Sequence, residues 1–149
     1  MAAKIADPPS PLLVNLIPCD LVIEDRYTGK ASIIGVFEYI EPNVYPFCMP
    51  TFSLFCQLTN GHGNVTIDVA IVDTRENDSV VFERKVDYQF KDPLEIANIV
   101  CVLINVVFSH EGEYRIVLKK GTETLGERRI VCGEVKQREG GEEYVPETE

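Results

Sequence analysis

The chain has 149 residues, of which 45% are hydrophobic and 26% are charged, and its formal net charge at pH 7 is −10. This size suits one domain with its own core, and the negative charge argues against nucleic acid as a partner. No apolar stretch approaches the ~18 residues of a membrane-spanning helix, and no export signal is recognisable. We therefore predict no membrane association and a cytoplasmic location.

Three segments differ in composition. Residues 1–11 contain Pro8, Pro9 and Pro11, which predicts a flexible arm. Residues 12–133 alternate short apolar runs with turn residues, which predicts a single β-sandwich domain. Residues 134–149 hold six Glu against two basic residues and are predicted to form an acidic, disordered tail.

The first part of this domain gives a clear hairpin signal. Apolar residues alternate along 19–24, residues 26–30 supply turn chemistry, and residues 31–39 resume as a strand. Residues 32–37 are apolar on both faces, so we expect both faces of that strand to be covered.

Residues 41–50 contain three prolines and must form a loop, yet they also carry Tyr45 and Phe47. One interpretation, which we favour, is a loop that crosses the end of the sandwich and plugs the core. The other is an exposed docking patch.

The middle of the chain alternates with the period of strands. The residues predicted to face the core are Phe52, Leu54, Cys56 and Leu58, then Val65, Ile67, Val69 and Ile71, then Val80, Phe82, Val86, Tyr88 and Phe90. Arg84 interrupts the last of these runs, which indicates an edge position or a bulge.

Asp92, Pro93 and Glu95 form the one helix-start signal, with Asp92 as N-cap and Glu95 placed to reach back to it. We predict a short helix near 92–98. From residue 99 to 108 the chain is apolar on both faces, with the even positions 102–108 expected to face the core and Leu103 and Val107 to face outward. Gly112 and Tyr114 then form a corner, residues 114, 116 and 118 face inward, and Gly126 marks a bulge.

The fold expected is all-β: an immunoglobulin-like antiparallel two-sheet sandwich of about seven to nine strands, with an N-terminal hairpin and one short helix. The run Gly112-Glu113-Tyr114-Arg115-Ile116-Val117-Leu118, followed by Gly121 and Leu125-Gly126-Glu127, resembles the end of immunoglobulin- and fibronectin-type sandwiches. This resemblance implies that the tyrosine hydroxyl bonds back to the preceding chain.

A second resemblance rests on the opening Cys19-Asp20-Leu21-Val22, on Gly35-Val36-Phe37, on the proline loop ending in Phe52, and on Gly112-x-Tyr114. Over residues 15–133 the chain resembles a family of uncharacterised bacterial proteins, a domain of unknown function with an immunoglobulin-like sandwich. That resemblance implies no activity, cofactor or site residues. The strand after the corner lacks the pairing cysteine of antibody domains, so no disulfide across the sheets is expected.

Little in the sequence predicts chemistry. The two histidines, His62 and His110, lie on turns expected at opposite ends of the sandwich, so they cannot share a metal or a catalytic centre. Five cysteines without a C-x-x-C indicate reduced thiols, and Cys19 and Cys48, near loops, are the ones to test for reactivity. The acidic residues 68, 73, 76, 78 and 87 lack the spacing of a calcium loop.

We therefore predict a non-enzymatic binding or structural module, without catalytic, cofactor or metal residues, that contacts another protein and forms a possible homodimer. Its predicted interaction surface comprises Ile34, Val36, Tyr45, Phe47, Leu103 and Val107. The alternative is a ligand-binding or hydrolytic sandwich with a sheet-end pocket that uses His62, Asp73 or Asp68. A calcium-dependent adhesion module is a third hypothesis, and the missing export signal speaks against it.

Overall fold

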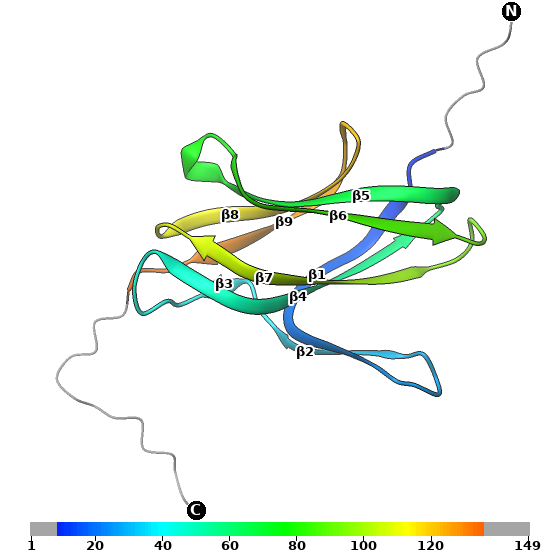
Figure 1. Ribbon diagram of the computed structural model, residues 1–149, viewed down its shortest axis with the longest axis horizontal. Coiled ribbons are helices and arrows are strands. Elements are labelled where there is room, and N and C mark those ends of the chain that lie inside the picture. Colours follow the sequence, from blue (N-terminus) through cyan, green and yellow to red (C-terminus); the bar gives the residue numbers. More distant parts are fainter. Residues whose placement is uncertain (1–8, 136–149) are drawn as a thin grey trace, which may run out of the picture.

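The computed structural model describes residues 9–135, so most of the predicted arm and nearly all of the predicted tail lie outside the described residues. Figure 1 shows two layers of strands, one above the other. Their bounds are β1 Leu12–Glu24, β2 Ala31–Val36, β3 Tyr39–Ile40, β4 Phe47–Thr59, β5 Gly63–Asp73, β6 Ser79–Phe90, β7 Ala97–Phe108, β8 Gly112–Lys120 and β9 Glu123–Cys132.

The strands form a four-stranded sheet in the order β2-β1-β4-β7, named sheet A here, and a five-stranded sheet in the order β3-β9-β8-β5-β6, named sheet B. An all-β fold of two sheets with seven to nine strands is thus confirmed. Every pairing is antiparallel except that of β3 with β9, which is parallel. The strand predicted over 31–39 is split, because the chain leaves sheet A after Val36, packs Phe37 edge-on against Phe52, and joins sheet B at Tyr39.

The core lies between the sheets and follows the predicted alternation in β4, β5 and β8. Val80 of β6, predicted to face the core, is instead 56% exposed, because the β5–β6 register shifts between Phe82 and Val80 and places Val80 opposite the outward-facing Val72. From β4 and β5 every predicted inward residue is buried, and from β8 Tyr114, Ile116 and Leu118 are fully buried. The register of β8 and β9 shifts beside Gly126, which confirms the bulge. Removing these apolar side chains from water stabilises the core by about 25 cal/mol for each Å² of apolar surface buried.

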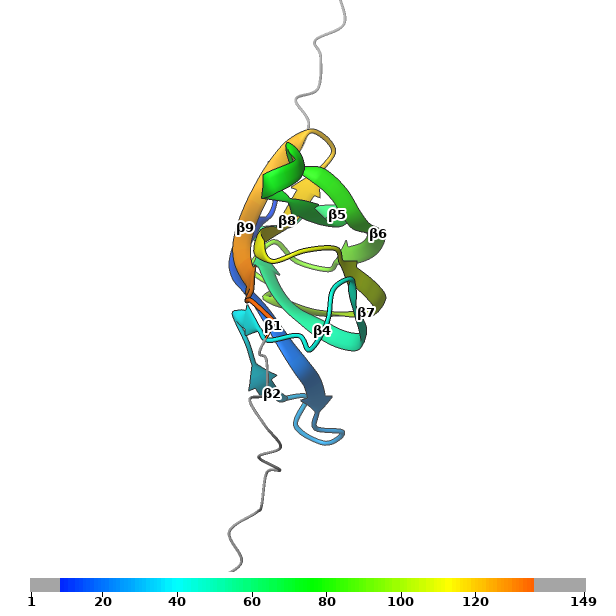
Figure 2. The same ribbon diagram turned by 90° about the vertical axis from the view of Figure 1, so that its left-hand side faces the viewer.

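Two arginines join the sheets along their sides. Arg84, on the edge strand β6 as expected, donates from Nη1 to the carbonyl oxygen of Val102 on β7 at 2.5 Å. On the other side Arg128 of β9 donates to the carbonyl oxygen of Leu16 on β1 at 2.8 Å. The first contact covers the edge of β7, whereas β2 at the other edge of sheet A lies in a hairpin that projects from the body (Figures 1 and 2).

The helix predicted near 92–98 is wrong. Asp92 does accept the backbone N–H of Leu94 at 2.8 Å, but a single turn follows and β7 begins at Ala97. The carboxylate of Glu95 is bound by the hydroxyl of Tyr88 at 2.7 Å and by the backbone N–H of Lys91 at 3.0 Å, so it does not complete a helical cap. The one helix among the described residues is a 3-10 turn, Thr74–Glu76.

The predicted facing of β7 is wrong in its first half. Ala97, Ile99, Cys101 and Leu103 are buried, so the odd positions face the core, and only at Val106 and Phe108 do even positions point inward. The switch falls at Asn105, whose φ of 55° lies in the left-handed region that asparagine tolerates better than most residues. The paired strand β4 changes face at the same level, because Phe47 and Met49 lean on the core while Phe52 and Leu54 are buried within it.

Candidate interaction surface

The outer face of sheet A is assembled by the strand register. Ile34 on β2 stands opposite Leu21 on β1, and Val36 opposite Cys19. Cys19 in turn faces Ser53 on β4, which faces Val102 on β7, so one row of side chains crosses all four strands. The neighbouring row runs through Ile17, Phe55 and Val100.

This face is apolar and exposed along two flanks. Its eight large aliphatic side chains are each 40% to 59% exposed, and we name them the apolar patch: Leu21, Ile23, Ile34 and Val36 on the β1–β2 flank, and Val100, Val102, Ile104 and Val107 on the β7 flank. Between the flanks, Ser53 and Phe55 are buried. Summed over the two flanks, these exposed fractions correspond to roughly 700 Å² of residue surface.

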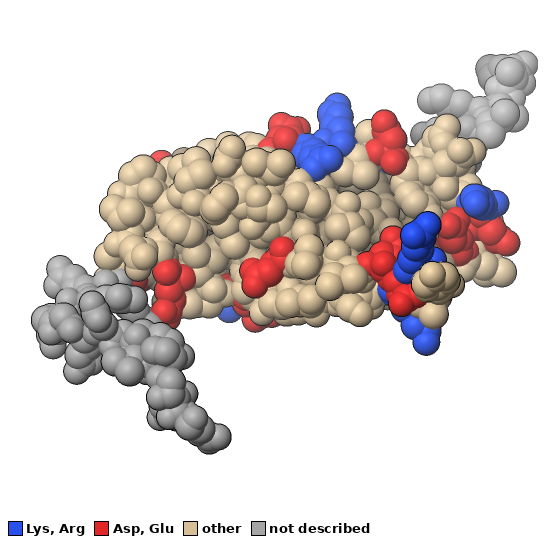
Figure 3. All heavy atoms as spheres, turned by 60° about the horizontal axis from the view of Figure 1, so that its bottom comes forward, with Lys and Arg blue, Asp and Glu red and all other residues tan. Residues whose placement is uncertain are grey.

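Within the strands, the outer face of sheet A carries no charged side chain among the described residues. Figure 3 shows this side of the molecule as a broad uncharged area, with charges gathered at the hairpin end and along the margins. Three of the polar side chains on this face bond to one another: Asn15 donates to Gln57 at 2.5 Å, and Gln57 donates to Asn98 at 2.9 Å. Ser32 and Thr51 are exposed beside the patch, opposite Ile23 and Ile104.

The predicted surface residues divide into three outcomes. Ile34, Val36 and Val107 lie on the apolar patch. Tyr45 and Phe47 are half-buried against the core, so the loop plugs the sandwich end, and Tyr45 donates its hydroxyl to the carbonyl oxygen of Gly133. Leu103 is fully buried and is corrected from surface to core.

The remaining members of the patch were missed. The sequence predicts an inward facing for Val102 and Ile104 because the alternation of β7 is carried through Asn105, and it assigns Val100 to neither face. Leu21 and Ile23 have a signal in the sequence, since they alternate in phase with Cys19 opposite the doubly apolar second arm of the hairpin. That alternation shows a shared face, but not whether the face is inner or outer.

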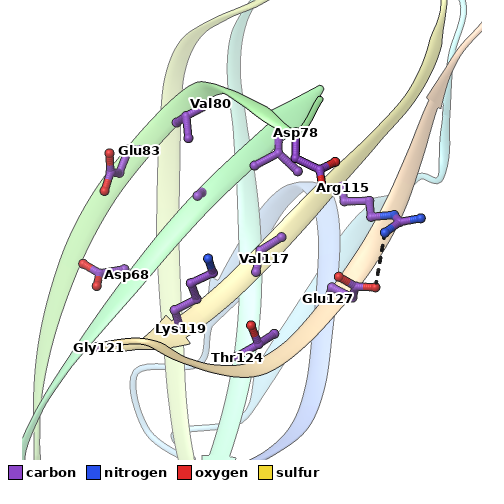
Figure 4. Close-up of a pocket in the computed structure, with 12 residues that line it drawn as sticks. Asp68, Asp78, Val80, Glu83, Arg115, Val117, Lys119, Gly121, Thr124 and Glu127 are labelled. Atoms are coloured by element: carbon purple, nitrogen blue, oxygen red, sulfur yellow. Dashed lines mark ion pairs between the residues drawn. The ribbon is translucent and has the colours of Figure 1, made fainter. Parts of the chain in front are cut away.

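The outer face of sheet B differs from that of sheet A because it carries charged side chains. A trough of about 370 Å³ lies on it, and its apolar lining residues are Ala70, Val72, Val80 and Val117, of which Val80 and Val117 are labelled in Figure 4. Arg115 pairs with Glu127 at 3.8 Å along one side. The other charged residues that line the trough are Asp68, Asp78, Glu83 and Lys119.

Asp68 Oδ1 is the one buried side-chain oxygen without a hydrogen-bond partner among the described residues. The position of Asp68 on β5 explains why this unpaired oxygen is tolerated. Asp68 stands directly opposite Lys85 on β6 and Lys119 on β8. Opposite charges in such cross-strand positions stabilise each other across several ångströms. The trough is thus lined by four acidic and two basic side chains, with Lys85 opposite Asp68 as a third base nearby.

A second cluster lies at the corner between β7 and β8. Asp73, only 2% exposed, accepts the backbone N–H of Arg75 at 3.1 Å and lies 2.5 Å from His110 Nε2. His110 Nδ1 lies 2.5 Å from the carbonyl oxygen of Glu111. The hydroxyl of Tyr114 donates to the carbonyl oxygen of His110 at 2.9 Å and accepts its N–H at 3.3 Å, as expected for a tyrosine at this corner.

The electrostatics of this corner favour a charged histidine. The carbonyl of Glu111, followed by the carboxylate of Asp73, raises the pKa of His110 above its ordinary value, against the opposing effects of burial and of Arg75. Both ring nitrogens are engaged by fixed groups of the protein. A histidine that acts as a general base must turn one nitrogen toward a nucleophile or substrate, so this cluster is built to hold a corner rather than to transfer protons.

The residues of the ligand-binding alternative do not converge. Asp73 lies with His110 at the end of the sandwich where β4 begins, His62 lies at the end where β4 finishes, and Asp68 faces outward from β5. In residues 9–135 no group of three or more His, Cys, Asp or Glu side chains is placed to hold a metal ion.

All five cysteines are free, and four of them are buried. Burial raises the pKa of Cys19, and it raises the pKa values of Cys56 and Cys132 to about 12. Such thiols are unreactive at neutral pH. Of the two proposed for testing, Cys19 is fully buried with a raised pKa, which disfavours reactivity, whereas Cys48 is exposed beside Val107.

Residues 15–132, from within β1 to the end of β9, match the model of a family of unknown function, DUF6941. The chain belongs to that family. All eight residues of the apolar patch and the whole corner cluster fall inside the DUF6941 region. No curated protein matches the sequence. Across residues 9–135, no helix is long and apolar enough to cross a membrane.

Proposed function

We propose that this DUF6941 chain is a non-enzymatic protein-interaction module whose contact surface is the outer face of sheet A. The observation that supports this most strongly is the contrast between the two outer faces. In register, the outer face of sheet B carries Asp68, Lys85, Glu83, Lys119, Arg115 and Glu127, while the outer face of sheet A carries no charged side chain from its strands, because Asp20 and Glu24 of β1 lie on the opposite face.

The contrast between the uncharged outer face of sheet A and the charged outer face of sheet B indicates which of the two contacts another protein. In an antiparallel sandwich the outer face of a sheet is normally solvated and polar. An exposed, uncharged apolar face lowers solubility and invites aggregation, so it signals contact with another protein. Covering each half-exposed aliphatic side chain contributes about 1 kcal/mol to association before the entropic costs.

The absence of an assembled reactive centre among the described residues supports the non-enzymatic part of the proposal. Asp73 and His110 are bound to each other and to the backbone, and Arg128 is bound to a backbone carbonyl. The four buried thiols support a reducing, cytoplasmic location. The corner bond of Tyr114 supports an immunoglobulin-like arrangement within the two-sheet fold.

The test is site-specific photo-crosslinking in the cell that naturally makes the protein. A photoreactive side chain at Ile104, 59% exposed on the apolar patch, is compared with one at Val80, 56% exposed beside the sheet B trough. We expect protein adducts from position 104 and few or none from position 80. Equal or absent adducts at both positions would show that the face of sheet A is not a contact surface.

A further inference from the structure

We infer that the surface which covers the apolar patch is the same face of a second copy of this chain, so that two sandwiches pack sheet A against sheet A in a twofold dimer. This inference names the partner and therefore rests on the proposed function. Three properties of the face support a second copy over an unrelated protein: its charge, its area and its polar border.

The charge argument starts from the net charge of −10. Two chains of this charge repel each other. A partner recruited by electrostatic attraction would need carboxylates on the contact surface to pair with its own Lys or Arg side chains. The apolar patch offers none, since its two flanks consist of aliphatic side chains only. The surface that complements an uncharged aliphatic face is another uncharged aliphatic face, and this chain is known to carry one.

The area agrees with what a stable dimer needs. The patch exposes roughly 700 Å², close to the ~800 Å² that each partner loses in an interface of standard size. A twofold dimer uses one surface twice, so a single patch of this size completes an interface without any other site. Two sheets that pack face to face in this way reproduce the layer contact already present inside the sandwich.

The polar residues beside the apolar patch are also compatible with contact between two copies of the chain. The amides of Asn15, Gln57 and Asn98 bond to one another along one margin, so part of their hydrogen-bonding capacity is already met within the chain. The shape is compatible with interdigitation, because exposed side chains form two flanks, with Ile34 and Ile104 among them, on either side of the buried Ser53 and Phe55. Each flank of one copy can lie over the middle of the other.

Sedimentation equilibrium of the full chain between about 1 and 100 µM tests the inference. We expect a species of twice the 16.7 kDa chain mass. Ile104→Glu and Val36→Glu, one on each flank, should each weaken the dimer by at least ~100-fold, because a buried unpaired charge is costly and a symmetric dimer contains it twice. Val80→Glu, matched in exposure, should leave the dissociation constant within about threefold.

Salt dependence of the unmodified protein provides a test that requires no variant. Raising NaCl from about 50 to 500 mM should tighten the dimer several-fold, since screening weakens the repulsion between two chains of charge −10. Weakening by salt would overturn the inference, because it would indicate a charge-paired interface.

Two further outcomes separate this inference from the proposed function. A wild-type chain that stays monomeric at about 100 µM, or a dimer that tolerates both flank substitutions, overturns the second-copy inference. If position 104 then crosslinks to a different protein in the cell, the interaction function stands and only the identity of the partner is refuted. If position 104 gives no more adducts than position 80, both fail.

Discussion

Replacing Tyr114 with phenylalanine removes one oxygen atom from the centre of the corner between β7 and β8. The ring is fully buried and packs edge-on against Phe108, with ring centroids 4.9 Å apart, so its packing stays intact in the variant. What is lost are the two bonds between the hydroxyl and the backbone of His110, at 2.9 and 3.3 Å. The perturbation therefore reports on the corner bonds alone.

The magnitude follows from the value of such bonds. Each contributes about 1 kcal/mol net, and their removal leaves a half-buried backbone N–H and carbonyl less well satisfied. We expect Tyr114→Phe to lower the free energy of unfolding by about 2 kcal/mol, which for a domain of this size corresponds to roughly 4–8 °C in melting temperature.

Urea unfolding followed by circular dichroism measures this loss, provided that the m-value is unchanged. Tyr27→Phe is the matched control, because Tyr27 is 94% exposed in the hairpin turn and its hydroxyl should contribute less than about 0.5 kcal/mol. A loss of under about 0.5 kcal/mol in Tyr114→Phe would refute the view that the tyrosine bond fixes this corner.

Three further predictions follow from individual residues. Because the folded protein raises the pKa of His110, its stabilising contribution is complete below about pH 6.5 and disappears as pH rises through the folded pKa. His110→Gln should thus flatten the melting temperature between about pH 5.5 and 8.5, and identical pH profiles would contradict this. Leu103→Ala should cost about 2–5 kcal/mol in urea unfolding and Val107→Ala less than about 1 kcal/mol, and the reverse order would restore the facing predicted from sequence. A thiol reagent should label Cys48 in the native protein and the other four cysteines only after unfolding.

The sequence predicts the sandwich well because alternation with period two is a local signal. It identifies the inward residues of β4, β5 and β8, and the resemblance to immunoglobulin- and fibronectin-type sandwiches implies a bond from the Tyr114 hydroxyl to the preceding chain, which the structure shows at His110. The contact between the Asp73 and His110 side chains could not be predicted from the sequence. These residues are 37 positions apart, and the relative placement of β5 and β7 brings them together.

The wrong helix and the wrong facing of β7 have a common physical cause, which is tertiary structure overriding a local signal. Asp92 and Pro93 are suitable for a helix start, but Tyr88 and Lys91 bind the carboxylate that a cap needs. In β7, both faces are apolar, so the alternation alone cannot say which face is inner. A single backbone angle at Asn105 reverses the two faces and thereby transfers Ile104 to the surface and Leu103 to the core.

Carbene footprinting of the full-length protein, read out by mass spectrometry, tests most directly whether the outer face of sheet A is covered. Ile104 and Val80 are 59% and 56% exposed in the single chain, so an isolated copy should label at nearly equal rates at the two positions. We predict that at about 100 µM labelling at Ile104 falls several-fold below labelling at Val80, and that the difference disappears on dilution. Equal labelling at both residues at every concentration would contradict the account.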